Sequence, residues 1–544
     1  MIRDQIKQNI INALIKSGYK IPEEFTPEIE IPKDRSHGDF STNAALILSK
    51  ELKINPRDIA AKITENIEKG IFEKVDIAGP GFINFFLKNN AWHKILKEVL
   101  EKKLDYGHQH DNPGAKKINL EFVSVNPTGP MHLAHGRWAV LGDTLANVLD
   151  FAGNKVTREY YVNDYGNQVN LLGKSLKARY LQSLGEKCEF PQDGYHGEYL
   201  IDLADKLKEE KGDSLKDASS GEFKNIAIDY MLNKLILKAL KASDVRFDVF
   251  FHESQLQKEN KVNEALKKLE ESGHTYKKDG AVFFKSTDFG DDKDRVIIKE
   301  DGESTYFLAD TAYHLNKMQR SFDLLINIWG ADHHGYVKRM KGAFQSLGYN
   351  PDDLLIIIGQ LVTLTKGGEI VKMSKRSGQM VTFQELLDEV GKDAVRFIFL
   401  TKSANTHLEF DLELAKKQSQ ENPVYYVQYA HARICSILKS AENKSDISSA
   451  DLTLLTQKEE INIIKKLETL PFLITLCAKN FEVHQLTHYS QELASLFHSF
   501  YNKHRVLNPD NPGLTLARIY LITAIQIVLN ITGRLLGVNM PESM

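Results

Sequence analysis

“INLEFVSVNPTGPMHLAHGRWAVLGD” (residues 118–143) passes from an apolar, strand-like run through a Pro-Thr-Gly-Pro turn into a helical pattern. Two histidines, His132 and His135, stand where the turn becomes the helix. A helix N-terminus offers unpaired backbone N–H groups and a positive dipole end, which suits a phosphate group. Most histidine pairs at this spacing are ordinary surface or core residues, so the rest of the chain must decide between the two interpretations.

Three further apolar runs alternate with helical patterns: “KVTREYYV” (155–162), “FDLLINIWG” (322–330) and “LLIIIGQLVTL” (354–364). Such alternation is typical of a parallel sheet with crossover helices. We therefore predict a multidomain α/β protein with a parallel-sheet, Rossmann-like catalytic domain, an N-terminal α+β domain and a C-terminal all-α helix bundle.

Changes of pattern along the chain predict four segments. Helical patterns at 1–18 and 41–70, followed by the strand-like “GFINFFL” (81–87), indicate the additional N-terminal domain. No strand is expected beyond about residue 391. The predicted bounds are 1–110 for the N-terminal domain, 111–390 for the Rossmann-like domain with a helical insertion at about 170–245, 391–421 for a helical connector and 422–544 for the helix bundle.

Charge and cysteine content limit the classes of protein to consider. The 544 residues carry a net charge of −3, so any contact with nucleic acid must use local patches rather than an overall basic surface. The cysteines (Cys188, Cys435 and Cys477) are far apart and form neither a metal-ligand spacing nor a disulfide framework. We expect no protein-bound metal and a reducing, cytoplasmic setting.

The apolar segment “ARIYLITAIQIVLNITGRLLGV” (517–538) is predicted to be a core helix of the bundle. Its longest uncharged run, 519–533, is shorter than the ~20 residues that a membrane span needs. Four polar residues draw one stripe along it: Arg518, Gln526, Asn530 and Arg534. The first twenty residues lack the apolar core of a signal peptide, and we expect no membrane contact.

A second candidate for phosphate binding is “GGEIVKMSKRSGQMVTF” (367–383). Lys372, Lys375 and Arg376 lie in a polar, glycine-flanked stretch between apolar segments, as in a mobile loop that closes on a polyanion. Taken alone, a solvated basic surface loop is the more ordinary interpretation.

Together, “HLAH” (132–135) and “KMSK” (372–375) resemble the paired signatures of class I aminoacyl-tRNA synthetases, and “WGADHHG” (329–335) resembles their ribose-binding segment. Amino-acid activation is an in-line attack on the α-phosphate of ATP, which requires positioning and neutralisation of phosphate charge. The resemblance implies ATP, with Mg²⁺ carried on the nucleotide, and His132, His135 and Lys375 as catalytic residues. The ATP-binding residues that it implies are His132, Ala134, His135, Gly136, Gly330, Asp332, Lys372, Met373 and Lys375.

Acidic residues in the same region favour a cationic amino acid. Glu121 ends the first strand, Tyr306 and Asp310 are four apart and share a face if helical, and Glu253 follows another apolar run. Carboxylates around a ligand that already carries a carboxylate suit a cationic side chain, and a planar guanidinium pairs with them better than an ammonium does.

Several ordered blocks resemble the arginyl-tRNA synthetases of the bacterial type. They include “EFVSVNPTGPMHLAHGR”, “YFLADTAYHLNK”, “WGADHHGYVKRMKGAFQSLGY”, “VKMSKRSG”, “RFIFLTKSANTHLEFDLELA” and “ENPVYYVQYAHARICSIL”, while “SHGDFSTNAA” and “GPGFINFFL” resemble the family's N-terminal domain. The resemblance implies activation of L-arginine with ATP to arginyl-adenylate and transfer to the terminal ribose of tRNA(Arg). It also implies that activation requires bound tRNA.

The resemblance assigns roles to individual residues. It implies that Asp310, Tyr306 and Glu121 bind the guanidinium, and that Asn126 and Ser124 hold the α-amino and carboxylate end. The full predicted arginine-binding set is Glu121, Ser124, Asn126, His135, Glu253, Tyr306, Asp310 and His333. Structural roles remain open: Glu121 as a strand-end acid paired with a lysine, Tyr306 as a core aromatic and Asp310 as a helix N-terminal acid.

One position departs from the family pattern. The third residue of the histidine signature is usually glycine, because adenine packs directly on that backbone, and here it is Ala134. The extra methyl group of Ala134 would keep the adenine from packing as closely on the backbone unless the backbone shifts slightly.

For tRNA, strand alternation places Phe82, Asn84 and Phe86 on one face, where two aromatics and an amide could bind an unstacked base. An ordinary half-buried strand is the alternative. The resemblance implies that this domain contacts the D-loop through Asn84 and that the bundle contacts the anticodon stem and loop, with Tyr501 and Arg505 as candidates.

Two rival functions were weighed. A smaller nucleotidyltransferase of the same superfamily would not need the N-terminal domain and the long helical C-terminus. A non-catalytic tRNA-binding paralogue would have lost some of the signature residues, and His132, His135, Asp310 and Lys375 are all present. We expect a monomer that binds tRNA(Arg), L-arginine and ATP.

Overall fold

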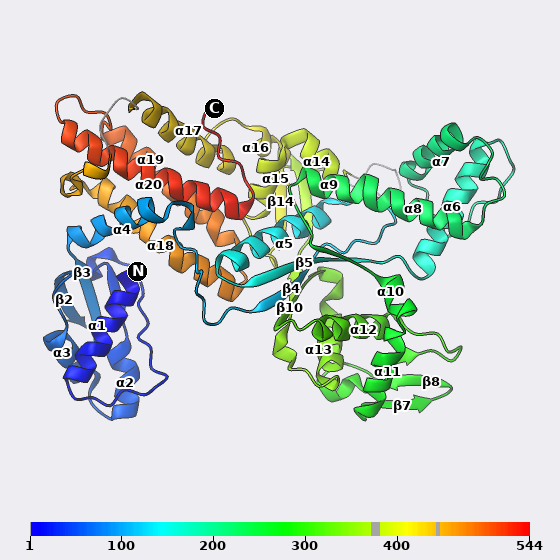
Figure 1. The fold of residues 1–544 in the computed structure, drawn as a ribbon, viewed down its shortest axis with the longest axis horizontal. Coiled ribbons are helices and arrows are strands. Elements are labelled where there is room, and N and C mark those ends of the chain that lie inside the picture. The colour runs from blue at the N-terminus through cyan, green and yellow to red at the C-terminus, as the bar shows by residue number, and fades with distance from the viewer. Residues whose placement is uncertain (1, 372–380, 442–446) are drawn as a thin grey trace.

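The computed structural model describes residues 2–371, 381–441 and 447–544. At its centre lies a five-stranded parallel sheet in the order β11-β10-β4-β5-β6, which confirms the predicted Rossmann-like domain (Figure 1). Its strands are β4 (Lys117–Glu121), β5 (Lys155–Val162), β6 (Val249–His252), β10 (Leu324–Gly330) and β11 (Leu354–Gly359). The chain adds β5 and β6 on one side of β4 and β10 and β11 on the other, so a crevice opens at the carboxyl ends of the strands.

Helices cover this sheet and position the crevice. The helix α5 (Leu133–Phe151) follows β4 and is buried along almost its whole length, because it contacts both the sheet and the C-terminal helices. On the other side, α12 (Tyr306–Gln319), the short 3₁₀ helix η5 (Ala331–Tyr336) and α13 (Val337–Ser346) surround β10.

The predicted helical insertion extends to one end of the molecule (Figure 1). It contains α6 (Asn167–Ser183), α7 (Glu198–Lys211), α8 (Ser220–Asp229), a π-helical stretch (Tyr230–Ile236) and α9 (Leu237–Ala242), with an apolar core of its own. Beyond β6 come α10 (Glu253–Lys258), α11 (Lys261–Glu271) and an antiparallel sheet of β7 (Thr275–Lys278), β8 (Ala281–Phe284) and β9 (Arg295–Ile298). This small sheet was not predicted.

The N-terminal region has the predicted α+β character, and the helical pattern at 41–70 contains two helices rather than a continuous one. The region consists of α1 (Ile2–Lys16), β1 (Phe40–Thr42), α2 (Ala44–Leu52), α3 (Pro56–Asn66), β2 (Phe72–Ala78), β3 (Phe82–Leu87) and α4 (Asn89–Lys102). The helix is interrupted because Lys53 is left-handed, with φ 55°, and Asn55 caps a new helix that has Pro56 at its first position.

The expectation of no strand after about residue 391 is wrong. The run at 354–364 divides into β11 and β12 (Val362–Lys366), and β12 pairs with β13 (Glu369–Ile370) and with β14 (Leu408–Asp411) in a separate sheet. Only Leu408 and Phe410 of β14 face the core, which is too short a pattern to stand out in the sequence. Three short helices pack around this sheet: α14 (Phe383–Val390), α15 (Lys392–Phe399) and α16 (Leu412–Lys416).

The C-terminal part is the predicted helix bundle, formed by α17 (Pro423–Ala441), α18 (Lys458–Asn480), α19 (His484–Lys503) and α20 (Pro512–Leu536). By length and composition alone α20 could cross a membrane, but 67% of its apolar stretch is buried inside the fold. Its polar stripe binds other helices: the Arg518 guanidinium pairs with Glu460 at 2.8 Å, and Gln526 donates to the Cys435 sulfur. As predicted, α20 serves as a core helix.

Candidate active site

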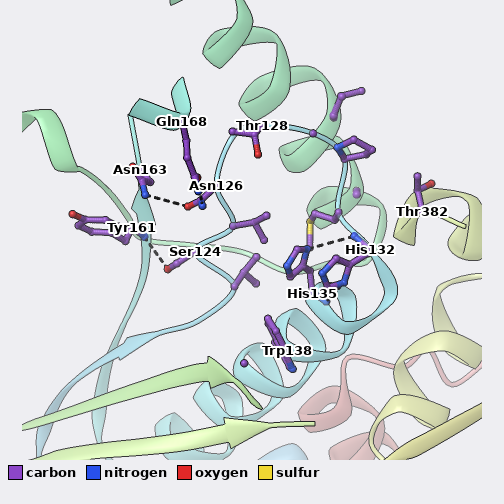
Figure 2. Close-up of a pocket in the computed structure, with 18 of the residues that line it drawn as sticks. Ser124, Asn126, Thr128, His132, His135, Trp138, Tyr161, Asn163, Gln168 and Thr382 are labelled. Carbon is purple, nitrogen blue, oxygen red and sulfur yellow. Dashed lines mark hydrogen bonds between the residues drawn. The ribbon is translucent and has the colours of Figure 1, made fainter. Parts of the chain in front are cut away.

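A cavity of about 1700 Å³ opens at the carboxyl ends of the parallel strands and extends toward the insertion (Figure 2). Eleven of the predicted site residues line it: Glu121, Ser124, Asn126, His132, His135, Glu253, Tyr306, Asp310, Gly330, Asp332 and His333. They come from segments far apart in the sequence that meet at the carboxyl ends of β4, β6 and β10 and at the first turns of α12. We call the region around Glu121, Glu253 and Asp310 the carboxylate end, and the region around His132 and His135 the histidine end.

At the histidine end, two imidazoles cap the N-terminus of α5. The backbone N–H of His132 donates to Nδ1 of His135, and the backbone N–H of His135 donates to Nδ1 of His132, both at 3.4 Å. The rings stack with centroids 3.3 Å apart. Figure 2 shows them side by side at the start of α5. Because Nδ1 accepts, each neutral ring carries its proton on Nε2 and is a donor there. Two N–H donors at the positive end of a helix suit a phosphate group.

Two predicted nucleotide-binding residues of this helix lie outside the cavity wall. A side chain at Gly136 would come within 2.2 Å of the Phe383 ring, so this glycine allows α14 to pack on α5. Ala134 is buried, 5% exposed, and does not line the cavity either. The other nucleotide-binding predictions, Lys372, Met373 and Lys375, fall outside the described residues.

The segment that follows residue 380 reaches the histidine end. Thr382 forms an antiparallel bridge with His132, and the backbone N–H of Phe383 donates to the Met131 carbonyl at 2.8 Å. Nearby, Arg137 is buried and donates to three carbonyl oxygens, those of Gln360, Ser403 and Thr406. Burial lowers the pKa of Arg137 to about 10. These contacts attach α5 to the β12–β14 sheet and to α14.

At the carboxylate end, Asp310 and Glu253 lie at the wall without a cation at salt-bridge distance among the described residues. The Tyr336 hydroxyl donates to Asp310 at 2.7 Å, and the Tyr161 hydroxyl contacts Glu253. Burial raises the pKa of Asp310 to about 6. Burial, and then the charge of Asp310, raise the pKa of Glu253 to about 7. Burial without a salt-bridged cation therefore favours the neutral form of both carboxyl groups, and a cation bound between them would favour the ionised form.

The third acid, Glu121, differs because it has an internal partner. Its Oε2 accepts from the Lys317 ammonium at 2.6 Å, and its Oε1 accepts from the Ser124 hydroxyl at 3.0 Å. Glu121 is therefore paired with a lysine at the end of its strand, as the structural interpretation of this residue predicted. It also lines the cavity. Ser124 reaches it through a strained turn in which Val123 and Ser124 have φ values of 68° and 41°.

Asn126 is fixed by the chain that leads into the insertion. Its Nδ2 donates to Gln168 at 2.8 Å, and its side-chain oxygen lies 3.2 Å from the Asn163 amide (Figure 2). The Tyr199 hydroxyl of α7 donates to the Thr128 carbonyl at 2.7 Å. The insertion thus forms part of the wall opposite the strand ends.

The ribose-binding prediction falls on η5, where Asp332 is largely exposed and lies 3.5 Å from His333. Glycines end the two neighbouring strands because the indole of Trp138 occupies the space where side chains would stand. A Cβ at Gly330 would lie 2.6 Å from this indole, and one at Gly359 would lie 2.4 Å from it. Trp138 thereby lines the cavity beneath Gly330.

Sequence reasoning missed the wall residues Trp138, Tyr161, Gln168 and Tyr336. It also missed Lys317, which lies buried behind the wall and pairs with Glu121. Tyr161 could have been found, since it lies at the carboxyl end of β5, at the same sheet edge as Glu121. Tyr336 belongs to a segment already quoted for its Gly-x-Asp pattern. The pairing of Lys317 with Glu121 has no signal in the sequence, because the residues are far apart along the chain.

The surface predicted to bind a base in the N-terminal region is only partly exposed. Ile83 and Phe85 of β3 face the core, while Phe82 on the opposite face is 39% exposed. Asn84 is only 6% exposed, because β3 is the central strand and Asn84 lies between Ser41 of β1 and Asp76 of β2.

In the bundle, Tyr501 and Arg505 line a second hollow of about 890 Å³ together with residues of α17. The Arg433 guanidinium lies between two aromatic rings there, 4.9 Å from Tyr429 and 4.8 Å from Tyr501. Among the described residues, no cluster of three or more His, Cys, Asp or Glu side chains could hold a metal ion.

Comparison with known proteins accounts for the whole chain. Three family models match: the arginyl tRNA synthetase N-terminal domain at residues 4–87, the catalytic domain of class I tRNA synthetases (R) at 95–434, and the DALR anticodon binding domain at 427–544. An arginine–tRNA ligase of Bacillus licheniformis is 47% identical over 100% of this chain and 99% of its own length. One of Syntrophotalea carbinolica is 48% identical over 95% of each chain. In fold, the structure superposes on the Thermus thermophilus arginyl-tRNA synthetase with a TM-score of 0.79, 21% identity and 100% coverage of both chains.

Proposed function

This chain belongs to the arginyl-tRNA synthetase family, and we propose that it joins L-arginine to tRNA(Arg) with the described cavity as its active site. The reaction class, an aminoacyl-tRNA ligation that consumes ATP, follows from the family. The first step forms arginyl-adenylate and pyrophosphate, and the second transfers arginine to the terminal ribose of tRNA(Arg).

The observation that carries the assignment of the arginine site is the pair of carboxylates without a cation, Asp310 and Glu253. A guanidinium between them would supply the missing charge and donate to the carboxylates in a planar, bidentate arrangement. Tyr306, at the first turn of α12 and 59% exposed, stands at the mouth on the same helix face as Asp310. Glu121 and His333 complete the wall, and Asn126 with Ser124 lies where the α-amino and carboxylate groups of the substrate would come.

The histidine end would bind the ATP phosphates. The Nε2–H donors of His132 and His135 face growing charge on the α-phosphate, which is an electrostatic role that needs no acid–base pair. Gly330 and Asp332 would contact the ribose. Mg²⁺ would arrive on the nucleotide phosphates, and Lys375 with Lys372 and Met373, which lie outside the described residues, would contribute further positive charge or contacts to the nucleotide.

For tRNA, the N-terminal domain (1–110) contacts the D-loop through Asn84, Phe82 and Phe86, and the bundle (422–544) contacts the anticodon arm near Tyr501 and Arg505. The family models for an N-terminal and an anticodon-binding domain support this division. We further propose that activation requires bound tRNA, and that the protein works in the cytoplasm as a monomer.

Arginine-dependent exchange between ATP and pyrophosphate tests the proposal. Purified, folded protein is expected to exchange with arginine plus tRNA(Arg), and far less with arginine alone or with lysine plus tRNA(Arg). Absence of exchange with arginine and tRNA(Arg) would refute the activity, whereas equal exchange without tRNA would refute only the tRNA requirement.

A further inference from the structure

Lys317 is a buried lysine beneath the carboxylate end, and nothing in the proposed reaction yet uses it. Its side chain is 0% exposed. The ammonium donates to Glu121 at 2.6 Å and to the Asn327 side-chain oxygen at 3.0 Å, and it lies 4.4 Å from the centre of the Tyr313 ring. A fully buried ammonium is rare unless an acid and further hydrogen bonds compensate it.

The two acceptors of Lys317 sit side by side in the sheet. Glu121 at the end of β4 is the register partner of Asn327 in β10. Lys317 comes from α12, so its ammonium joins the two central strands to the helix that carries Asp310. The network continues to Asp310 itself, because Asn327 contacts Nε2 of His314 at 2.7 Å and Nδ1 of His314 contacts the Asp310 carbonyl oxygen at 2.7 Å.

We propose that Lys317 is a positioning residue of the arginine site, which holds the Glu121 carboxylate in one orientation and cancels its charge. Asp310 and Glu253 then remain as the counter-charges of the guanidinium. This inference rests on the proposed arginine site and adds a residue that never touches the substrate.

The electrostatics of Asp310 support this role. The positive charge of Lys317 lowers the pKa of Asp310, whereas the negative charge of Glu121 raises it, and burial outweighs both. The titratable and charged groups that face Asp310 from the surrounding elements are Glu121, Lys317, Glu253, Tyr161 and Tyr336. Without Lys317, Asp310 would face the Glu121 charge uncompensated and would take up a proton at higher pH, which would weaken arginine binding as the pH falls.

A double-mutant cycle separates this role from a purely structural one. Wild type, Lys317→Met, Glu121→Gln and the double variant are compared by steady-state exchange at saturating tRNA(Arg), with arginine and ATP varied in turn. Lys317→Met is expected to raise the KM for arginine by ~10-fold or more, with the KM for ATP changed by less than ~3-fold. It should also move the acidic limb of the kcat/KM profile for arginine to higher pH.

In the Glu121→Gln background, the same Lys317→Met change is expected to raise the KM for arginine by less than ~3-fold, because Lys317 acts through the Glu121 charge. Lys267→Met, at an exposed lysine of α11, is the matched control and should leave both KM values unchanged. Equal effects of Lys317→Met in the two backgrounds, or equal effects on arginine and ATP, would overturn the proposal.

Two further outcomes are decisive. If Lys317→Met does not fold, the Glu121→Gln and double variants still decide: similar arginine KM values support the proposal, and a further ~10-fold rise overturns it. If Asp310→Asn raises the arginine KM and Lys317→Met does not, only the role of Lys317 fails. A wild-type protein without arginine-dependent exchange would instead refute the proposed function.

Discussion

At the carboxylate end of the cavity, acidic side chains from β4, α10 and α12 are fixed by hydrogen bonds between side chains. At the histidine end, two rings on one helix N-terminus bond to each other's backbone. The first region holds carboxyl groups that a bound cation would keep ionised, since no cation of the described chain forms a salt bridge with Asp310 or Glu253. The second offers neutral donors and the positive end of a helix.

This difference assigns different tasks to the two ends. Fixed carboxylates select a cationic substrate in the ground state, so changes there should act mainly on the KM for arginine. Donors aimed at phosphate gain strength as charge develops in the transition state, so changes there should act mainly on kcat. The predictions below test this division, from the largest expected effect to the smallest.

Replacement of a histidine should give the largest loss. His135→Ala is expected to lower kcat of ATP–pyrophosphate exchange by ~100- to 1000-fold, because one donor to the phosphate charge is removed. The KM for arginine should stay within ~3-fold, since the carboxylate end is unchanged. Steady-state kinetics with a thermal melt as a folding control measure this. A large rise in the KM for arginine would contradict the assignment of phosphate binding to the histidine end and arginine binding to the carboxylate end.

Asp310→Asn should act at the opposite end. Loss of a charge-assisted hydrogen bond to the guanidinium predicts a rise in the KM for arginine of ~10- to 100-fold, with little change in the KM for ATP. Asp217→Asn, at an exposed acid of the insertion between α7 and α8, is the matched control and should change neither. Equal rises for arginine and ATP would mean that Asp310 does not bind the guanidinium.

The raised pKa values predict opposite pH dependences for the free and the arginine-bound protein. Asp310, with a pKa of about 6, and Glu253, with a pKa of about 7, bind protons more tightly in the fold than when unfolded. Their contribution to stability is therefore present below the unfolded pKa values and lost as the pH rises through about 6 and 7. Arginine needs them ionised, so its stabilising effect should grow over the same range.

Melting curves from pH 5.5 to 8 with and without arginine check this, and the arginine-induced rise in Tm should be larger at pH 8 than at pH 6 by ~2–4 °C. The same rise in Asp310→Asn should depend less on pH. An arginine-induced rise in Tm that is constant with pH would contradict the proposed ionisation of these groups.

The smallest effect is expected outside the cavity. Asn84→Ala should raise the KM for tRNA(Arg) by ~2- to 10-fold, as for loss of one hydrogen bond. Exchange at saturating tRNA should be unaffected, because neither end of the cavity changes. Aminoacylation kinetics over a range of tRNA concentrations measure this, with exposed Lys69→Ala on the same domain as control. An unchanged KM for tRNA(Arg) would mean that Asn84 does not contact the tRNA.

Local rules explain what could be predicted from the sequence. A strand, a turn and a helix start identified the histidine end, and Glu121 and Glu253 follow from the common edge of parallel strands, since they lie at the ends of β4 and β6. Asp310 lies in α12, and its place beside them was implied by the family resemblance. Contacts between distant segments could not be predicted in this way. The pairing of Lys317 with Glu121, and the packing of Phe383 against Gly136, depend on which helix docks where.

Three predictions from the sequence were wrong or incomplete because they depend on a short element, a local backbone conformation or the order of strands in a sheet. The strand β14 has only two core-facing residues, and the helix expected at 41–70 ends at a left-handed Lys53 that the periodicity does not reveal. The low exposure of Asn84 follows from the central position of β3, which depends on the order of strands in its sheet.

The number of protons released when arginine binds tests most directly whether the carboxylate end lacks a positive charge until substrate arrives. Titration calorimetry in two buffers with different ionisation enthalpies gives this number. With pKa values of about 6 for Asp310 and about 7 for Glu253, binding near pH 6.5 should release about one proton, and binding near pH 8 almost none. Arginine binding without proton release near pH 6.5 would contradict the account.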